Sequence, residues 1–296
     1  MNAIRSVLAA TDFSETARYA ARRAAMLACE HQADLRLVHV LNEPSLATVK
    51  FLLKGVADIE AGLLADVRKS LQEEAAALTA AHSAKVDARV LVGKVVEEIL
   101  AEGSRADLVV AGARGDNPVR DILLGSTAER LVGRSLSPVL VVKRAPEGAY
   151  RRVLLAVDLA EVPAEELRLA MRIAPDAEIT VLHAYTLPFE GRLSLAGVAE
   201  SDIGRYRAEV ARQSRQQIES LIRAEAGGRG GVHALVVRGD APFVILKKQE
   251  ELEADLIVLG CRSQSALEMF FLGSVSRHVL SDAGCDVLVR PNRIDG

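Results

Sequence analysis

The feature that most constrains this chain is an internal repeat whose period is close to half of its 296 residues. The segment Arg120–Arg144 resembles Glu268–Pro291, and within it Gly125 aligns with Gly273, 148 residues further on. Four other blocks recur in the same order at offsets between 144 and 148. Because order, spacing and residue identity agree, the pattern indicates duplication of one unit rather than chance likeness between common strand sequences.

The junction between the two copies is short and contains the structure breakers Pro146 and Gly148. Apolar, strand-like runs end just before it and begin again just after it. We therefore predict two domains, residues 1–146 and residues 150–296, each of the length usual for a single hydrophobic core.

The composition excludes several classes of protein. Hydrophobic residues make up 50% of the chain and charged residues 26%, which excludes a disordered or collagen-like chain. The 37 basic and 40 acidic residues give a net charge of −3, without the basic excess typical of a nucleic-acid partner. The longest uncharged run has 11 residues, whereas a membrane span needs about 20.

The N-terminus and the cysteines bear on location. The first residues lack the apolar core of a signal peptide, and the three cysteines have no metal-type spacing. Free thiols are typical of a reducing compartment. We expect a soluble, cytoplasmic protein with no membrane span and no metal site of its own.

Each copy alternates apolar runs typical of strands with segments typical of helices. Ser14 is a predicted N-cap, followed by an alanine-rich helical segment. Continuous apolar strands joined by helices indicate a parallel sheet covered on both faces, and right-handed crossovers make it doubly wound. The fold class predicted is therefore α/β, with two five-stranded parallel-sheet domains in tandem. The strand-like runs of the first copy are VLAA, LRLVHVL, ARVLVG, DLVVAG and PVLVVK.

A glycine pattern follows the fourth predicted strand of the first copy. It reads G-x2-G-x9-G-S-T, and ligands of such sheets bind beyond the carboxyl ends of the strands. We expect its first two glycines to approach a ligand closely and to adopt positive φ. The hydroxyls and free N–H groups at the following helix start suit a phosphate. Each residue alone is an ordinary turn or cap residue, but the complete spacing is more specific. The pattern comprises Gly112, Gly115, Gly125, Ser126 and Thr127.

Four segments of the first copy together resemble the universal stress protein family, and the whole chain, from Ile4 to about Val289, resembles a tandem member. The segments are VLAATDFSETARYAARRA, LRLVHVL, ADLVVAGARG and RDILLGSTAERLVGRSLSPVLVVKR. The glycine pattern matches the subgroup that binds ATP, with Mg or Mn as a common companion. The resemblance implies a fold like that of the adenine nucleotide alpha hydrolases.

The resemblance also implies roles for residues of the first copy. The five residues of the glycine pattern take the ribose and phosphates. Asp12, next to Thr11 and just beyond the first predicted strand, takes the adenine together with Val40 at the end of the second.

The second copy departs from this pattern. Ser263 stands where the first copy has Gly115, and a side chain there would crowd the phosphates or forbid a positive φ. Ala184 replaces Val40 on the adenine side. We predict a nucleotide in the first domain and a weaker or altered site in the second. The candidate residues of the second site are Asp158, Ala184, Gly260, Ser263, Gly273, Ser274 and Val275.

Other residues are also candidates for a functional role. His39 and His183 occupy equivalent strand positions, and we interpret them as buried, hydrogen-bonded histidines. Cys261, within the second glycine loop, is a candidate redox-sensitive thiol. Arg114 and its counterpart Arg262 either reach a phosphate or are solvated loop charges.

The favoured hypothesis is a regulatory stress protein that binds ATP, hydrolyses it slowly at most, and signals through an unknown protein partner. No catalytic residue, P-loop lysine or nucleophile elbow is predicted. One alternative is a genuine ATPase or phosphotransferase that uses Asp12 or a loop arginine. Another is a module for an apolar or lipid-like ligand, which would use Pro44–Gly62 and Pro188–Gly204.

The end strands of the two copies, PVLVVK and CDVLVR, suggest how the copies associate. They resemble the edge strands that the family uses for dimer contacts, and an unpaired apolar edge promotes association. We expect an intramolecular pseudo-dimer of the two domains, and leave open whether two chains form a homodimer.

Overall fold

The computed structural model describes residues 3–44, 48, 59–115, 124–160, 163–187, 192, 195–260 and 272–291. The chain divides into two compact units: unit 1 comprises residues 1–149 and 261–296, and unit 2 comprises residues 150–260. The division after Ala149 falls at the junction between the repeats, but the end of the second repeat belongs to unit 1. The domains predicted at 1–146 and 150–296 stay a prediction.

The sheet of unit 1 contains five parallel strands and one antiparallel strand. Their order is β3-β2-β1-β4-β5-β10, and β10 runs antiparallel to β5, with Leu288 opposite Leu140. The predicted α/β fold with a mostly parallel sheet is confirmed. The strands are β1 (Ser6–Ala10), β2 (Asp34–Asn42), β3 (Val86–Gly93), β4 (Leu108–Gly112), β5 (Val139–Val142) and β10 (Asp286–Arg290).

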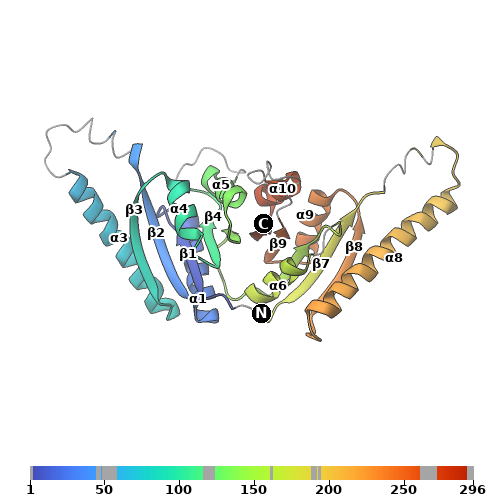
Figure 1. Ribbon diagram of the computed structural model, residues 1–296, viewed down its shortest axis with the longest axis horizontal. Helices are drawn as coiled ribbons and strands as arrows, with labels where there is room; N and C mark the ends of the chain where they lie inside the picture. The colour runs from blue at the N-terminus through green and yellow to red at the C-terminus, as the bar shows by residue number, and fades with distance from the viewer. Residues whose placement is uncertain are drawn as a thin grey trace. The chain divides into compact units, whose positions relative to one another are not determined.

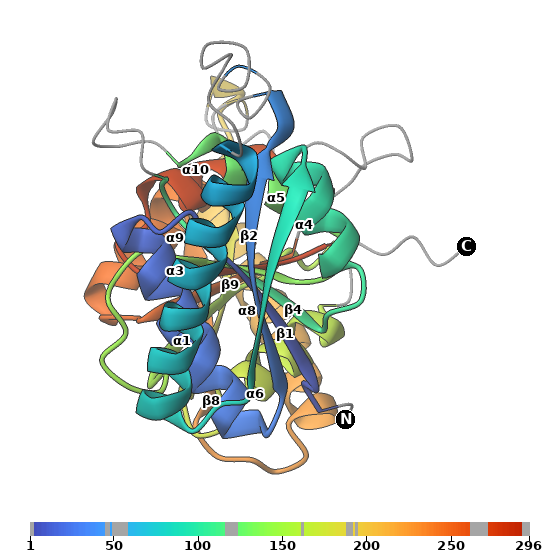
Figure 2. The same cartoon turned by 90° about the vertical axis from the view of Figure 1, so that its left-hand side faces the viewer.

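Helices cover both faces of this sheet. Figure 2 shows α1 and α3 on one face of the strands β1 to β3, and α4 and α5 on the other. Ser14 caps α1 as predicted, since its side chain accepts a hydrogen bond from the N–H of Ala17. Alanines on α1 are fully buried, which lets the helix lie close to the strands. The helices are α1 (Glu15–His31), α3 (Ile59–His82), α4 (Val95–Gly103), α5 (Ser126–Arg134) and α10 (Ser274–Asp282).

Unit 2 repeats the alternation of strands and helices (Figure 1). Its four strands are all parallel, in the order β9-β6-β7-β8. The long helix α8 packs along β8 and against α6, while α9 packs on β6 and β7. The elements are β6 (Arg152–Ala156), α6 (Ala164–Ile173), β7 (Glu178–Tyr185), α8 (Glu200–Glu225), β8 (Val232–Arg238), α9 (Ala241–Glu251) and β9 (Leu256–Gly260).

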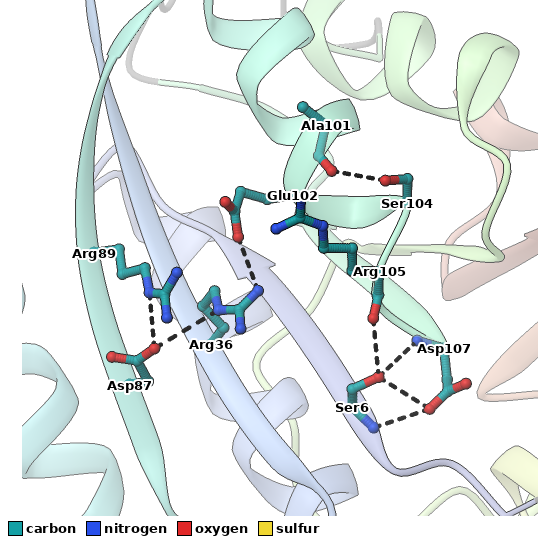
Figure 3. Close-up of polar contacts among 9 residues, drawn as sticks. All are labelled: Ser6, Arg36, Asp87, Arg89, Ala101, Glu102, Ser104, Arg105 and Asp107. Atoms are coloured by element: carbon teal, nitrogen blue, oxygen red, sulfur yellow. Dashed lines mark hydrogen bonds and ion pairs between the residues drawn. The ribbon is translucent and has the colours of Figure 1, made fainter.

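A repeated aspartate fixes the amino ends of the central strands. The Asp107 carboxylate accepts a hydrogen bond from the backbone N–H of Ser6 at 3.0 Å (Figure 3). It also accepts one from the backbone N–H of Arg5 at 2.9 Å. Its counterpart Asp255 accepts from the backbone N–H groups of Arg151 and Arg152 at 2.8 and 3.1 Å. The aspartate of the repeated Ala-Asp-Leu sequence therefore links the amino ends of two neighbouring strands in each repeat.

The same end of unit 1 carries an ion-pair cluster. Arg36 on β2 pairs with Glu102 at 2.8 Å and with Asp87 at 3.7 Å, and Arg89 also pairs with Asp87 (Figure 3). These contacts brace the amino ends of the strands. The candidate functional residues lie at the opposite, carboxyl ends.

Candidate functional site

A cavity of about 740 Å³ lies at the carboxyl ends of β1 and β4 in unit 1. Its lining residues come from the turn after β1, the loop after β4 and the start of α5, and also from the helices α1 and α4. The site residues predicted from the first repeat that line this cavity are Thr11, Asp12, Gly112, Gly115, Gly125, Ser126 and Thr127.

Val40 is the one predicted residue of the first repeat that is not among the lining residues. It lies near the end of β2, opposite Leu91 of β3, and is 9% exposed. The pairing of β1 with β2 extends only to Ala10 and Val38, so Val40 lies beyond the end of β1. A contact between Val40 and adenine stays a prediction.

Gly115 brings the loop after β4 against the turn after β1. A Cβ added at Gly115 would lie 2.7 Å from Asp12 Oδ2, closer than side chains normally approach. The other oxygen, Asp12 Oδ1, accepts a hydrogen bond from the N–H of Ser14 at 3.0 Å. The absence of a side chain at Gly115 therefore leaves room for the carboxylate at the wall of the cavity.

Gly112 is required by packing against α1. A Cβ there would lie 2.8 Å from the carbonyl carbon of Thr16 and from the backbone N of Ala17. Thr16 Oγ1 also donates a hydrogen bond to the carbonyl of Arg114, which ties the loop to α1. The prediction of positive φ at Gly112 and Gly115 is wrong, because both glycines serve close approach with ordinary backbone angles.

The first turn of α5 presents hydrogen-bond donors to the cavity. Its N-cap is Gly125, which has no side chain to satisfy the free N–H groups of the first turn. The N–H of Gly125 donates to the carbonyl of Ala113 at 2.8 Å, which fixes the helix start beside the loop after β4. Ser126 and Thr127 are exposed in the cavity wall. The positive end of the helix dipole and these groups favour an anion.

A second carboxyl group that the sequence analysis missed lies beside Thr11. Thr11 Oγ1 donates to Glu74 Oε2 at 3.5 Å, and the N–H of Phe13 donates to Thr11 Oγ1 at 3.1 Å. Burial raises the pKa of the Glu74 carboxyl, while the Arg18 guanidinium lowers it. Helical periodicity places Glu74 on α3, but only the folded chain brings it to β1, so no local motif indicated it.

The paired histidines make equivalent contacts. His39 Nδ1 lies 2.9 Å from the carbonyl oxygen of Thr11, and His183 Nδ1 lies 3.1 Å from that of Val157. A carbonyl can only accept a hydrogen bond, so Nδ1 carries the proton in both rings. Their interpretation as hydrogen-bonded strand histidines is confirmed, with both residues half-buried rather than fully buried.

The predicted site residues of the second repeat are divided between the two units. Asp158 follows β6 in unit 2, and its Oδ1 accepts from the N–H of Ala160 at 3.0 Å, as Asp12 does with Ser14. Ala184 lies half-buried on β7, and Gly260 ends β9. The others belong to unit 1: Gly273 is the N-cap of α10, and Ser274 and Val275 begin that helix.

The second glycine loop, with Cys261, Arg262 and Ser263, lies outside the described residues. Most of Pro44–Gly62 and part of Pro188–Gly204 lie outside them as well. The second nucleotide site and the apolar-ligand site therefore stay predictions.

Three features of the described residues relate to the expectations about membranes, metals and cysteines. None of the helices in these ranges combines the length and the apolar character needed to cross a bilayer. In the same ranges, no three His, Cys, Asp or Glu side chains gather where they could hold a metal. Cys29 is an exposed free thiol, and Cys285 is a buried cysteine whose Sγ donates to the carbonyl of Asp286 at 3.5 Å.

Comparison with known proteins places both repeats in one family. The model of the Universal stress protein family matches residues 3–143 and again residues 149–291. A universal stress protein of Methanocaldococcus jannaschii is 30% identical over 154 residues, covering 47% of this chain and 95% of the relative. One from Mycolicibacterium smegmatis is 24% identical over 303 residues, covering 96% of both chains.

A solved structure shares the fold over nearly the whole chain. The universal stress protein of Archaeoglobus fulgidus superimposes with a TM-score of 0.66 at 22% identity. The match covers 96% of this chain and 97% of that one. The tandem α/β architecture is therefore shared with a known protein along its full length.

Proposed function

The chain belongs to the universal stress protein family of stress-response proteins, and from this premise we propose that unit 1 binds an adenine nucleotide, ATP above all. The proposal rests on the meeting of the predicted site residues at one cavity. Seven residues predicted from the sequence, scattered from Thr11 to Thr127, line one cavity. The parallel strands β1 and β4 bring these segments to one end of the sheet, and the polar groups that they carry there support a shared ligand.

The size and lining of the cavity suit a nucleotide. Its volume of about 740 Å³ falls within the roughly 300–1,000 Å³ usual for ligand pockets. Val95, Ile99 and Leu131 provide an apolar wall for a flat base, and polar groups converge from the other segments. A few directed polar groups in a mainly apolar pocket are what small-molecule sites require.

The polar groups divide into acceptors and donors. The Asp12 carboxylate can accept hydrogen bonds from an adenine amino group or a ribose hydroxyl. Ser126, Thr127 and the free N–H groups at the start of α5 can donate to phosphate oxygens, and Arg114 adds positive charge. Oxygens of the nucleotide phosphates, together with water molecules, would hold an accompanying Mg or Mn ion.

We place the role of this site in regulation rather than in metabolism. The predicted residues bind and orient, and hydrolysis, if it occurs, would be slow. A signalling protein partner and a cytoplasmic location remain parts of the proposal. A turnover of about 1 s⁻¹ or faster, an ordinary enzymatic rate, would instead favour the ATPase alternative.

The test is to identify small molecules that co-purify with the protein. Extraction followed by mass spectrometry separates the three hypotheses: ATP or another adenine nucleotide, an apolar ligand, or none. Calorimetric titration with ATP then measures affinity, and cAMP is the second probe because one solved universal stress protein is in complex with cAMP. Failure of both nucleotides to bind, or recovery of a lipid alone, would contradict the proposal.

A further inference from the structure

A second cavity adjoins the first in unit 1. Its volume is about 510 Å³, and Arg114 and Leu124 line both cavities. The new walls come from the residues after β5, Lys143 and Arg144, and from the end of α10 and its following loop, residues 280–284. All of these residues belong to unit 1.

The lining of the second cavity carries an excess of positive charge. Arg114, Lys143 and Arg144 face a single carboxylate, that of Asp282. Lys143 Nζ donates to the carbonyls of Ala283 at 2.7 Å and Ser281 at 3.3 Å, which uses two of its three N–H donors. Arg144 is exposed. The cavity therefore offers an anion at least two cationic groups with donors to spare.

Lys143 is a cation held in an environment that disfavours its charge. Burial lowers its pKa to about 8 and the nearby Arg114 guanidinium adds to this, whereas Cys285, Asp282 and Asp286 act in the opposite direction. An anion in the cavity would relieve both the desolvation and the repulsion from Arg114. A negatively charged neighbour would therefore stabilise the charged form of the Lys143 amine.

We infer that the second cavity is an anion subsite that takes the terminal phosphates of a nucleoside triphosphate bound in the first. The inference rests on the proposed function, since it needs a nucleotide at α5. Arg114 and Leu124 line both cavities, so the two cavities adjoin at these residues. A monophosphate would reach only the donors at the start of α5, whereas a triphosphate would extend to Lys143 and Arg144.

The second repeat lacks a cation at the position of Lys143. The position equivalent to Lys143 in the second repeat is Pro291, which carries no charge and no N–H donor. Selectivity for triphosphates over monophosphates is therefore expected at the cavity that contains Lys143.

Calorimetric titration of the full chain with ATP and with AMP tests the subsite. Each of Lys143→Met and Arg144→Gln should weaken ATP binding about tenfold, the value of one charge-assisted hydrogen bond, and leave AMP binding within about twofold. Lys143→Met also removes two hydrogen bonds, to the carbonyls of Ser281 and Ala283, and this loss alone can disturb the fold. Because Arg144 is exposed, Arg144→Gln tests the subsite even if Lys143→Met misfolds. Lys85→Met, which removes an exposed charge paired with Asp34, is the matched control.

The outcomes separate the two proposals. Weaker ATP binding with unchanged AMP binding supports the subsite. Normal AMP and ATP binding in both variants overturns the subsite and leaves the proposed function intact. Absence of binding of either nucleotide to the wild-type chain overturns the proposed function and the subsite with it.

Discussion

Gly112 in the first repeat and its counterpart Gly260 in the second have different surroundings. At Gly112, an added Cβ would meet the backbone of α1 at 2.8 Å, and backbone cannot move aside. At Gly260, it would meet the carboxylate end of Glu166 at 2.9 Å, which a change of side-chain rotamer can relieve. Main-chain atoms therefore exclude a side chain at Gly112, whereas at Gly260 a flexible side chain does so. The difference indicates that a side chain at this position is harder to accommodate in the first repeat.

Among the predictions that test this comparison between the repeats, the largest effect is expected on ATP binding. Gly115→Val should weaken it by about 100-fold or more, because a branched side chain would displace Asp12 and enter the cavity. Gly204→Val, on α8 in unit 2 with open space around it, is the control. Calorimetry that finds ATP affinity unchanged in Gly115→Val would refute the assignment of this loop.

The next effect is on stability. Gly112→Ala should lower the free energy of unfolding by about 2 kcal/mol, the scale of overpacking against rigid neighbours. Gly260→Ala should cost less than about 1 kcal/mol, because Glu166 can turn away. Denaturant unfolding of both variants measures the contrast. Equal losses would remove the distinction between the repeats.

These glycines also show where sequence reasoning stopped. The spacing of the glycine pattern identified which residues line the cavity, since parallel strands place their following loops at one end of the sheet. The positive φ that it predicted at Gly112 and Gly115 is wrong, because a Cβ there is excluded by α1 and Asp12 rather than by φ, while their close approach to a ligand stays a prediction. Such contacts depend on the distance between elements, which periodicity does not encode.

Two residues of unit 1 gave no signal in the sequence at all. Glu74 reaches Thr11 only because α3 packs against α1 beside the strands. Lys143 lies against the end of α10, which comes from the other repeat and is more than 130 residues away in the chain. Periodicity places each on its own element, but a contact between distant elements needs the folded chain.

A smaller effect is expected from the paired aspartates. Asp12→Asn should weaken ATP binding about tenfold, since it replaces a charged acceptor while Oδ1 can still accept from Ser14. Asp158→Asn, the matched change in unit 2, should leave the affinity for ATP within about twofold. The same titration measures both, and an equal loss in the two variants would show that both repeats contribute.

The smallest expected effect is the pH dependence of ATP binding. The pKa of Lys143 is about 8, so the amine loses most of its charge between pH 7 and pH 9 in the free protein. ATP phosphates titrate near pH 6 and keep their charge over this range. Affinity for ATP should therefore fall a few-fold as pH rises, while affinity for AMP should not.

Two variants isolate Lys143 in this pH profile. Lys143→Arg keeps its charge and should flatten the profile. Cys285→Ser removes a neighbouring thiol whose ordinary pKa of about 8.5 lies in the same range, and should leave the profile unchanged. A profile that persists in Lys143→Arg would assign the titration to another group. The charged groups around the amine are Arg114, Asp282, Asp286 and, when ionised, Cys285.

The central claim is that unit 1 holds the complete nucleotide site of this chain. The stoichiometry of ATP binding to the wild-type protein, measured by calorimetric titration, tests it most directly. We expect one tightly bound ATP per chain. Two equally tight sites per chain, or no binding at all, would contradict the account.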